Sequence, residues 1–164
     1  MEVRLARPAD AEAIRGIYNL EVTTSTATFD LVPRTLAEQQ AWLAARSGAH
    51  AVVVAVEGTG DGEVVGFASL SPYRDRPAYR TTVEDSVYVR GDHRGSGVGG
   101  LLLEELLTVA AASGFHAVMA RIVDGHDASI ALHRRHHFTL VGVEREIGRK
   151  FGRWLDVIVM QRLL

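Results

Sequence analysis

Several glycines crowd the start of a predicted helix near the middle of the chain. The stretch "RGDHRGSGVGGLLLEELL", residues 90–107, has glycine at 91, 95, 97, 99 and 100, directly before a long apolar run. Glycine weakens a helix by about 1 kcal/mol per residue, so this pattern indicates that bare backbone is needed there. A strand, a glycine-rich loop and a helix N-terminus together form an arrangement that holds phosphate with backbone N–H groups. The segment therefore predicts an anion-binding loop.

Several kinds of glycine loop share this spacing, and the neighbouring residues distinguish them. The glycines are not followed by Lys-Ser or Lys-Thr, so the segment is not a P-loop. A dinucleotide-binding loop opens the first strand–helix–strand unit of its domain, whereas this loop lies past the middle of the chain. Asp124, after the next predicted strand, leaves a weak dinucleotide interpretation open. A glycine-rich turn without a ligand is the other alternative.

The histidine-rich stretch "LHRRHHF" invites a metal interpretation. His133 and His137 are four residues apart and share a helical face. No glutamate lies between them in the H-E-x-x-H pattern, and the chain has no cysteine. We therefore expect no metal. The stretch is locally basic, as is "GRKFGR", but it lacks the aromatic interleaving of a nucleic-acid surface, so we expect solvated faces there.

Strands and helices alternate around these residues. Apolar and β-branched runs predict strands near 3–6, 49–58, 64–72, 81–89, 116–123, 139–148 and 154–164. Helices are expected after Pro8 and Asp10, after the capping box of Thr35 and Glu38, from the glycine loop to about Ser113, and in "DASIALHRRHHF". The runs 49–58 and 64–72 predict a hairpin around the turn "TGDGE". The class is α/β.

Length and composition restrict the class of protein further. The chain has 164 residues, a formal net charge of −2 and no cysteine. It shows no repeat, no linker, no signal-peptide pattern and no apolar run long enough to span a bilayer. We expect a single domain over residues 1–164, cytoplasmic, without a nucleic-acid or membrane partner.

Residues 94–99, Arg-Gly-Ser-Gly-Val-Gly, resemble the R/Q-x-x-G-x-G/A pyrophosphate loop of the GNAT superfamily of N-acetyltransferases. The resemblance to its phosphinothricin N-acetyltransferase-like branch runs nearly from Val3 to Leu164, through "IYNLEVTTSTATFD", "YRDRPAYRTTVEDSVYV", "SIALHRRHHF" and "GRKFGRWLDVIVMQ". It implies a GNAT fold, with a mixed central sheet of about six to seven strands flanked by about four helices. Acetyl-CoA is then expected in the cleft after the fourth strand.

The resemblance also assigns residues to the coenzyme. Main-chain groups of the fourth strand are expected to pair with the pantetheine arm, and the glycine loop with the pyrophosphate. The implied coenzyme-binding residues are Val87, Tyr88, Val89, Arg94, Gly95, Ser96, Gly97, Val98, Gly99, Gly100 and His126. The family often has asparagine where this chain has His126, and Gly-Phe where it has His137-Phe138.

The catalytic and acceptor residues follow from the same resemblance. Glu84 matches the glutamate of the fourth strand and is the expected general base, with a pKa raised by burial or a proton relay through water. Asp85 is expected to point to the opposite face. His133 stands where the branch has histidine and other members have the tyrosine that protonates the leaving thiolate. The implied acceptor-binding residues are Phe29, Arg74, Arg76 and Tyr79.

The expected function is transfer of acetyl from acetyl-CoA to the amine of a small amino-acid-like molecule in a ternary complex. The acceptors that the resemblance implies are of the phosphinothricin, methionine sulfoximine and methionine sulfone type, and it also implies a homodimer. Two alternatives stay open: acetylation of another amine, such as a polyamine or a protein N-terminus, and a coenzyme-A-binding sensor without turnover. A polyamine site would need several acidic residues, whereas the acceptor loop here is rich in arginine.

Overall fold

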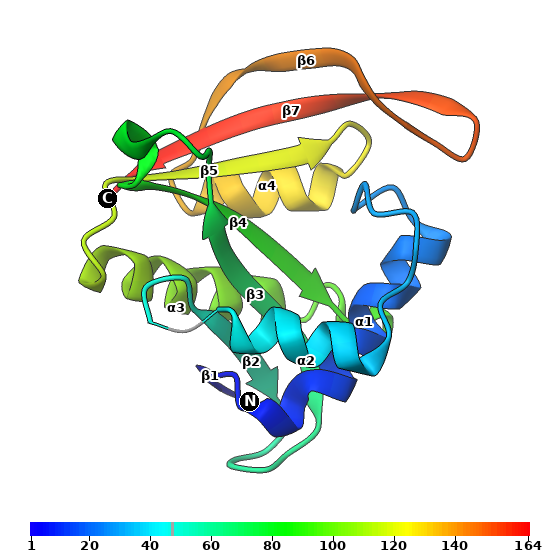
Figure 1. The fold of residues 1–164 in the computed structure, drawn as a ribbon, viewed down its shortest axis with the longest axis vertical. Helices are drawn as coiled ribbons and strands as arrows, with labels where there is room; N and C mark the ends of the chain where they lie inside the picture. Colours follow the sequence, from blue (N-terminus) through cyan, green and yellow to red (C-terminus); the bar gives the residue numbers. More distant parts are fainter. Residues whose placement is uncertain (47) are drawn as a thin grey trace.

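The computed structural model describes residues 1–46 and 48–164. In this part of the chain, seven strands form one mixed sheet, flanked by four α-helices (Figure 1). The strands are β1 (Glu2–Leu5), β2 (Val52–Val56), β3 (Val64–Pro72), β4 (Thr82–Val89), β5 (Ala117–Val123), β6 (Thr139–Lys150) and β7 (Arg153–Leu163). The helices are α1 (Ala11–Thr24), α2 (Leu36–Ala44), α3 (Val98–Ala112) and α4 (Asp127–Arg135). This arrangement confirms the predicted α/β class, with a mixed sheet of seven strands and four flanking α-helices.

The sheet order is β1-β2-β3-β4-β5-β7-β6. All neighbouring strands are antiparallel except β4 and β5, which are parallel and pair only over Thr82–Glu84 and Ala117–Met119. Beyond Glu84, β4 pairs with β3 alone. The sheet is therefore open between β4 and β5, at the strand that carries the predicted base.

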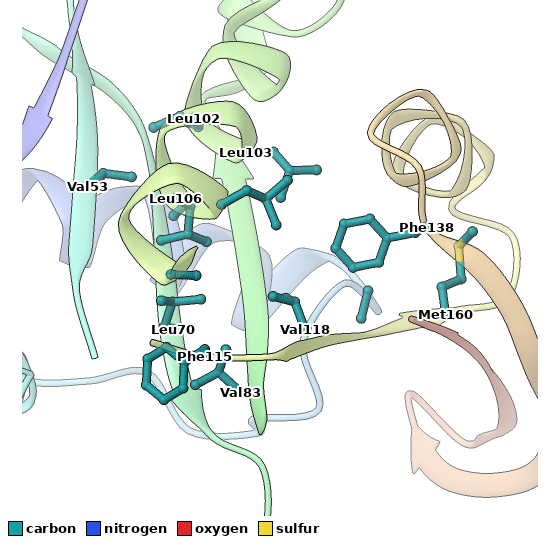
Figure 2. Close-up of a cluster of buried hydrophobic side chains, with 14 of the residues drawn as sticks. Val53, Leu70, Val83, Leu102, Leu103, Leu106, Phe115, Val118, Phe138 and Met160 are labelled. Carbon is teal, nitrogen blue, oxygen red and sulfur yellow. The ribbon is translucent and has the colours of Figure 1, made fainter. Parts of the chain in front are cut away.

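Two apolar clusters fix the helices on opposite faces of the sheet. Leucines of α3 pack with residues of β2, β3 and β4, and Figure 2 shows Leu102, Leu103 and Leu106 on the helix, with Val53 to one side and Leu70 below them. Buried residues of α1 pack with β2 and β3 on the other face. Because α3 presents a broad apolar surface, its N-terminal turn is held rigidly beside the end of β4.

Local sequence signals explain the element boundaries. Thr35 Oγ1 accepts from the Glu38 N–H at 3.2 Å, and Glu38 Oε2 accepts from the Thr35 N–H at 2.8 Å, so the predicted capping box starts α2. Helix α3 ends at Ala112, and Gly114 follows with φ +83°, the backbone conformation that favours glycine after a helix. The predicted hairpin is the antiparallel pair β2–β3.

Candidate active site

A cavity of about 680 Å³ opens where β4 and β5 separate. Its walls are β4 from Glu84 to Val89, the glycine loop, β5, α4 and the segment that follows α1. Odd- and even-numbered residues of β4 both line it, because the cavity passes through the gap in the sheet. The side chains of Glu84 and Asp85 leave opposite faces of β4, and Asp85 contacts His133 on α4, yet both residues line the cavity.

The glycine loop forms one end of this cavity. Gly95 and Gly97 have φ of +76° and +91°, and Gly97 is the N-cap of α3. A Cβ at Gly99 would lie 3.4 Å from the Leu132 side chain, so a side chain there would fill space beside α4 that the glycine leaves open. Since the first N–H groups of a helix lack intrahelical partners and carry partial positive charge, this end fits a pyrophosphate.

Two other members of the loop turn away from the cavity. The Ser96 hydroxyl donates to the His93 carbonyl oxygen at 2.6 Å. The Val98 side chain is buried in the core beneath the loop. These two residues shape the loop, and their side chains do not line the cavity.

Arg94 is held at the mouth of the loop by two partners. Its Nε donates to the Val89 carbonyl oxygen at 3.2 Å, and its guanidinium forms an ion pair with the buried carboxylate of Glu21 on α1. Hydrogen bonding to Asp92 raises the pKa of the neighbouring His93, which favours the imidazolium form. The loop therefore begins with an oriented cation, as phosphate binding requires.

Beyond Glu84, the side of β4 that faces β5 has no strand partner. Val87 and Val89 pack their side chains on the α3 cluster. The Tyr88 ring lies against Phe67 with centroids 5.2 Å apart, and burial raises the pKa of its hydroxyl. These side chains are packing residues, so any contact with a ligand here is made by main-chain N–H and C=O groups.

Glu84 stands where β4 and β5 separate, opposite Met119 in the parallel register. Its carboxyl lines the cavity and is half-buried. Burial raises the pKa of Glu84 above its usual range, while the positive charge of Arg121 opposes the rise. A carboxylate with a raised pKa accepts a proton from an amine more readily than an exposed one does.

His133 lies on α4, behind β4, and is buried. Its Nε2 is 3.0 Å from Asp85 Oδ2, and its Nδ1 is 2.7 Å from the Ser129 carbonyl oxygen. Burial opposes the charged ring, but the charge and hydrogen bond of Asp85 and the Ser129 carbonyl outweigh it, so the pKa of His133 is raised. Each ring nitrogen therefore lies beside an acceptor oxygen, an arrangement that favours the protonated ring.

The segment after α1 forms the wall above Glu84. His126 Nε2 lies 2.8 Å from Thr26 Oγ1, which joins the start of α4 to this segment. The buried Lys150 Nζ donates to the Thr28 carbonyl oxygen at 2.8 Å. A Cβ at Gly148 would come within 2.3 Å of the Phe29 ring, so the β6–β7 hairpin and this segment are closely fitted. Phe29 lines the cavity.

The other predicted acceptor residues lie outside the cavity wall. Arg74 and Arg76 are exposed, and the Arg74 guanidinium carbon is 5.0 Å from the Tyr73 ring centroid and 5.8 Å from that of Tyr79. None of Arg74, Arg76 and Tyr79 lines the cavity. The loop was predicted correctly from its composition, but its side chains stack on one another.

Sequence reasoning missed two charged residues of the cavity. Glu21 continues the apolar face of Ile14, Ile17 and Tyr18 at helical spacing, so a carboxylate at this buried position was a signal for a paired charge. Arg121 interrupts the apolar strand "HAVMARIV" on the face of Met119. Both deviations from apolar patterning point into the cavity.

The described residues contain no group of three or more His, Cys, Asp or Glu side chains that could hold a metal ion. None of the described helices has the length and apolarity needed to cross a membrane.

Comparison with known proteins agrees with this geometry. The model of the acetyltransferase (GNAT) family matches residues 14–138. An L-methionine sulfoximine/L-methionine sulfone acetyltransferase from Pseudomonas aeruginosa is 45% identical over 161 residues, which cover 97% of this chain and 92% of the relative.

Solved structures show the same fold over the whole length. A phosphinothricin acetyltransferase from Sinorhizobium meliloti in complex with acetyl-CoA is 40% identical, with a TM-score of 0.94 over 99% of this chain and 88% of that one. A ribosomal-protein-alanine N-acetyltransferase from Brucella melitensis is 39% identical, with a TM-score of 0.95 over 100% of both chains. From its fold, its glycine loop and these matches, this chain belongs to the GNAT family of acetyltransferases.

Proposed function

We propose that this enzyme transfers the acetyl group of acetyl-CoA to the amine of a small amino-acid-like acceptor, of the methionine sulfone, methionine sulfoximine and phosphinothricin kind. The observation that carries the proposal is the place of Glu84. Its half-buried carboxyl lies in one cavity that begins at the glycine loop and ends at the apolar wall of Phe29. The relative from Pseudomonas aeruginosa supports this acceptor class.

The coenzyme-binding residues occupy the loop end and the β4 edge. Acetyl-CoA supplies an acetyl thioester when it is bound. The N–H groups at Gly97 and Gly99 and the Arg94 guanidinium hold the pyrophosphate, while the Gly100 N–H donates to the Gly97 carbonyl oxygen at 3.0 Å and Gly100 supplies bare backbone beside them. Main-chain groups of Val87–Val89 on the side of β4 that has no neighbouring strand hold an extended arm as such a strand would. His126 forms part of the cleft wall beside the coenzyme, where its ring is hydrogen-bonded to Thr26.

Glu84 is the general base in this proposal. An α-amino group has a pKa near ~8 and arrives partly protonated at neutral pH, so attack requires removal of a proton. The Glu84 carboxylate takes that proton directly or through a water. A backbone N–H near Val89 stabilises the negative charge that develops on the carbonyl oxygen. Holding both reactants in one cavity supplies proximity and orientation.

We propose that His133 positions helix α4 and does not act as the general acid that protonates the leaving thiolate. Both of its ring protons are bonded, to Asp85 and to the Ser129 carbonyl. A thiol pKa near ~8.5 lets the leaving sulfur depart as thiolate and take its proton from water. His133 therefore fixes α4 against β4 at the residue next to Glu84.

The acceptor class is tested with a thiol-release assay using acetyl-CoA and a panel of amines. The panel contains L-methionine sulfone, L-methionine sulfoximine, phosphinothricin, ordinary amino acids, spermidine and a peptide with a free N-terminal alanine. The proposal predicts turnover of the amino-acid analogues and little of spermidine or peptide. Faster turnover of the peptide would instead favour the activity in the name of the Brucella relative. Coenzyme binding without turnover of any amine would favour a sensor.

We also propose that residues 1–164 form one acetyltransferase domain that works as a homodimer in the cytoplasm. The described hairpin β6–β7 exposes many large apolar side chains, which a second copy would cover: Leu140, Val141, Val143, Ile147, Phe151 and Trp154. Sedimentation velocity at micromolar concentration is expected to give a dimer, and Ile147→Asp is expected to shift it towards monomer. A monomeric wild type would contradict this.

A further inference from the structure

Arg121 lies on the same face of the sheet as the proposed base. Glu84 is opposite Met119 in the parallel register, and Arg121 follows Met119 by two residues on β5. Side chains at i and i+2 of a strand share a face. From strand spacing and rise, the Cα atoms of Glu84 and Arg121 are about 8 Å apart or more. Both residues line the cavity, so the base and a cation look into the same space.

The surroundings of Arg121 leave most of its guanidinium without a protein partner. Its Nη1 lies 2.8 Å from Glu144 Oε1, reached across β7, and the two side chains are 28% and 33% exposed. No other carboxylate contacts Arg121 among the described residues. A guanidinium has five N–H donors in a planar fork, and the contact with Glu144 involves one nitrogen.

The rest of this face is apolar. Met119 and Val123 on β5 and Val157 and Val159 on β7 form a buried cluster around Arg121. An arginine among such residues, beside a general base, is unfavourable for a simple cationic amine because it repels the ammonium. The positive charge of Arg121 also opposes the rise in the pKa of Glu84, and a higher pKa would make Glu84 a stronger base. The carboxylate of an acceptor with an acid group next to its amine would be attracted by the Arg121 guanidinium, and by offsetting the positive charge it would weaken both effects.

We propose that Arg121 binds the carboxylate of the acceptor while Glu84 receives the proton of its amine. This makes α-amino acids with a free carboxylate the substrate class, and it excludes polyamines. The inference rests on the proposed acetyltransferase function and refines its acceptor. Arg74 and Arg76, the arginines that sequence reasoning chose for this role, do not line the cavity, and Arg74 stacks on Tyr73 and Tyr79.

The test compares L-methionine sulfone with its carboxamide, which has the same side chain and amine but no carboxylate charge. The wild type is expected to prefer the acid by about 10- to 100-fold in kcat/KM, the range of a charge-assisted hydrogen bond. Arg121→Gln should abolish this preference by raising KM for the acid, with KM for acetyl-CoA unchanged. Arg121→Lys should restore part of it, because the charge returns without the fork.

Matched variants separate this role from a structural one. Glu144→Gln removes the same ion pair and leaves the guanidinium, so the preference for the acid should survive. Arg74→Gln and Arg76→Gln should also keep it. Retained preference in Arg121→Gln would overturn the inference, as would loss of preference in Arg74→Gln or Arg76→Gln.

Equilibrium binding of the acid and the amide, measured by calorimetry without coenzyme turnover, distinguishes failure of this inference from failure of the proposed function. Acid binding that depends on Arg121 without acetylation would contradict the function and keep the binding role. Turnover of the acid with unchanged preference in Arg121→Gln would contradict the binding role alone. Absence of both binding and turnover in the wild type would overturn both.

Discussion

Glu84→Gln is expected to lower kcat by about 10²- to 10⁴-fold, the usual contribution of a general base. Glutamine keeps the size and shape of the side chain but cannot accept the amine proton. Among the described residues, no side chain forms a hydrogen bond with the Glu84 carboxyl. The substitution should therefore leave the fold unaffected. The affinity for acetyl-CoA should stay nearly unchanged, because its proposed contacts are at the glycine loop and the β4 edge.

The same experiment includes a pH profile and a surface control. The wild-type kcat/KM is expected to fall as the pH drops through the pKa of Glu84, which burial raises above its ordinary value near ~4.3. Glu84→Gln should lack this acidic limb. Glu104→Gln, on the exposed side of α3, should behave as the wild type. Full activity of Glu84→Gln would show that another group removes the proton.

Asp85→Asn is expected to lower the free energy of unfolding by about 3 kcal/mol, because it breaks a buried ion pair. The side chains of His133 and Asp85 are only 4% and 2% exposed. In a chain of this length the melting temperature should fall by about 6–12 °C. Asp61→Asn breaks the exposed pair with Arg7 and should change stability by less than about 1 kcal/mol.

The effect of Asp85→Asn should depend on pH. The pKa of His133 is raised in the folded state, so its contribution to stability is fully present below the unfolded value near ~6.5. That contribution is lost as the pH rises through the folded pKa. Urea unfolding at about pH 6 and about pH 9 should therefore show the larger difference between wild type and variant at the lower pH. An equal difference at both would mean that His133 is not charged in the folded protein.

Features that depend on neighbouring residues were predictable from the sequence. The capping box of Thr35 and Glu38, the hairpin β2–β3 and the glycine loop before α3 all rest on residues a few positions apart. Their physical causes are local: hydrogen bonds of a first helical turn, alternation in a strand, and backbone freedom at Gly97. The predicted strand, loop and helix order therefore agrees with the structure, and so does the position of Glu84 on the fourth strand.

Features that depend on distant pairing were not predictable. Asp85 and His133 are 48 residues apart, and Lys150 reaches a carbonyl 122 residues away. Arg121 enters the cavity because β4 and β5 separate after only three paired positions, and strand pairing lengths cannot be obtained from one sequence. The position of Arg74 and Arg76 outside the cavity wall could not be predicted for the same reason. A loop rich in arginine has many possible partners, and here it stacks on its own tyrosines.

The most direct test of the central claim is the thiol-release assay with acetyl-CoA and L-methionine sulfone, followed by mass spectrometry of the acceptor and of the intact enzyme. Release of the free thiol in step with formation of N-acetyl-methionine sulfone, without an acetylated enzyme, is the predicted result. Bound acetyl-CoA with no acetylated acceptor, or an acetyl group that accumulates on the protein, would contradict direct transfer at Glu84.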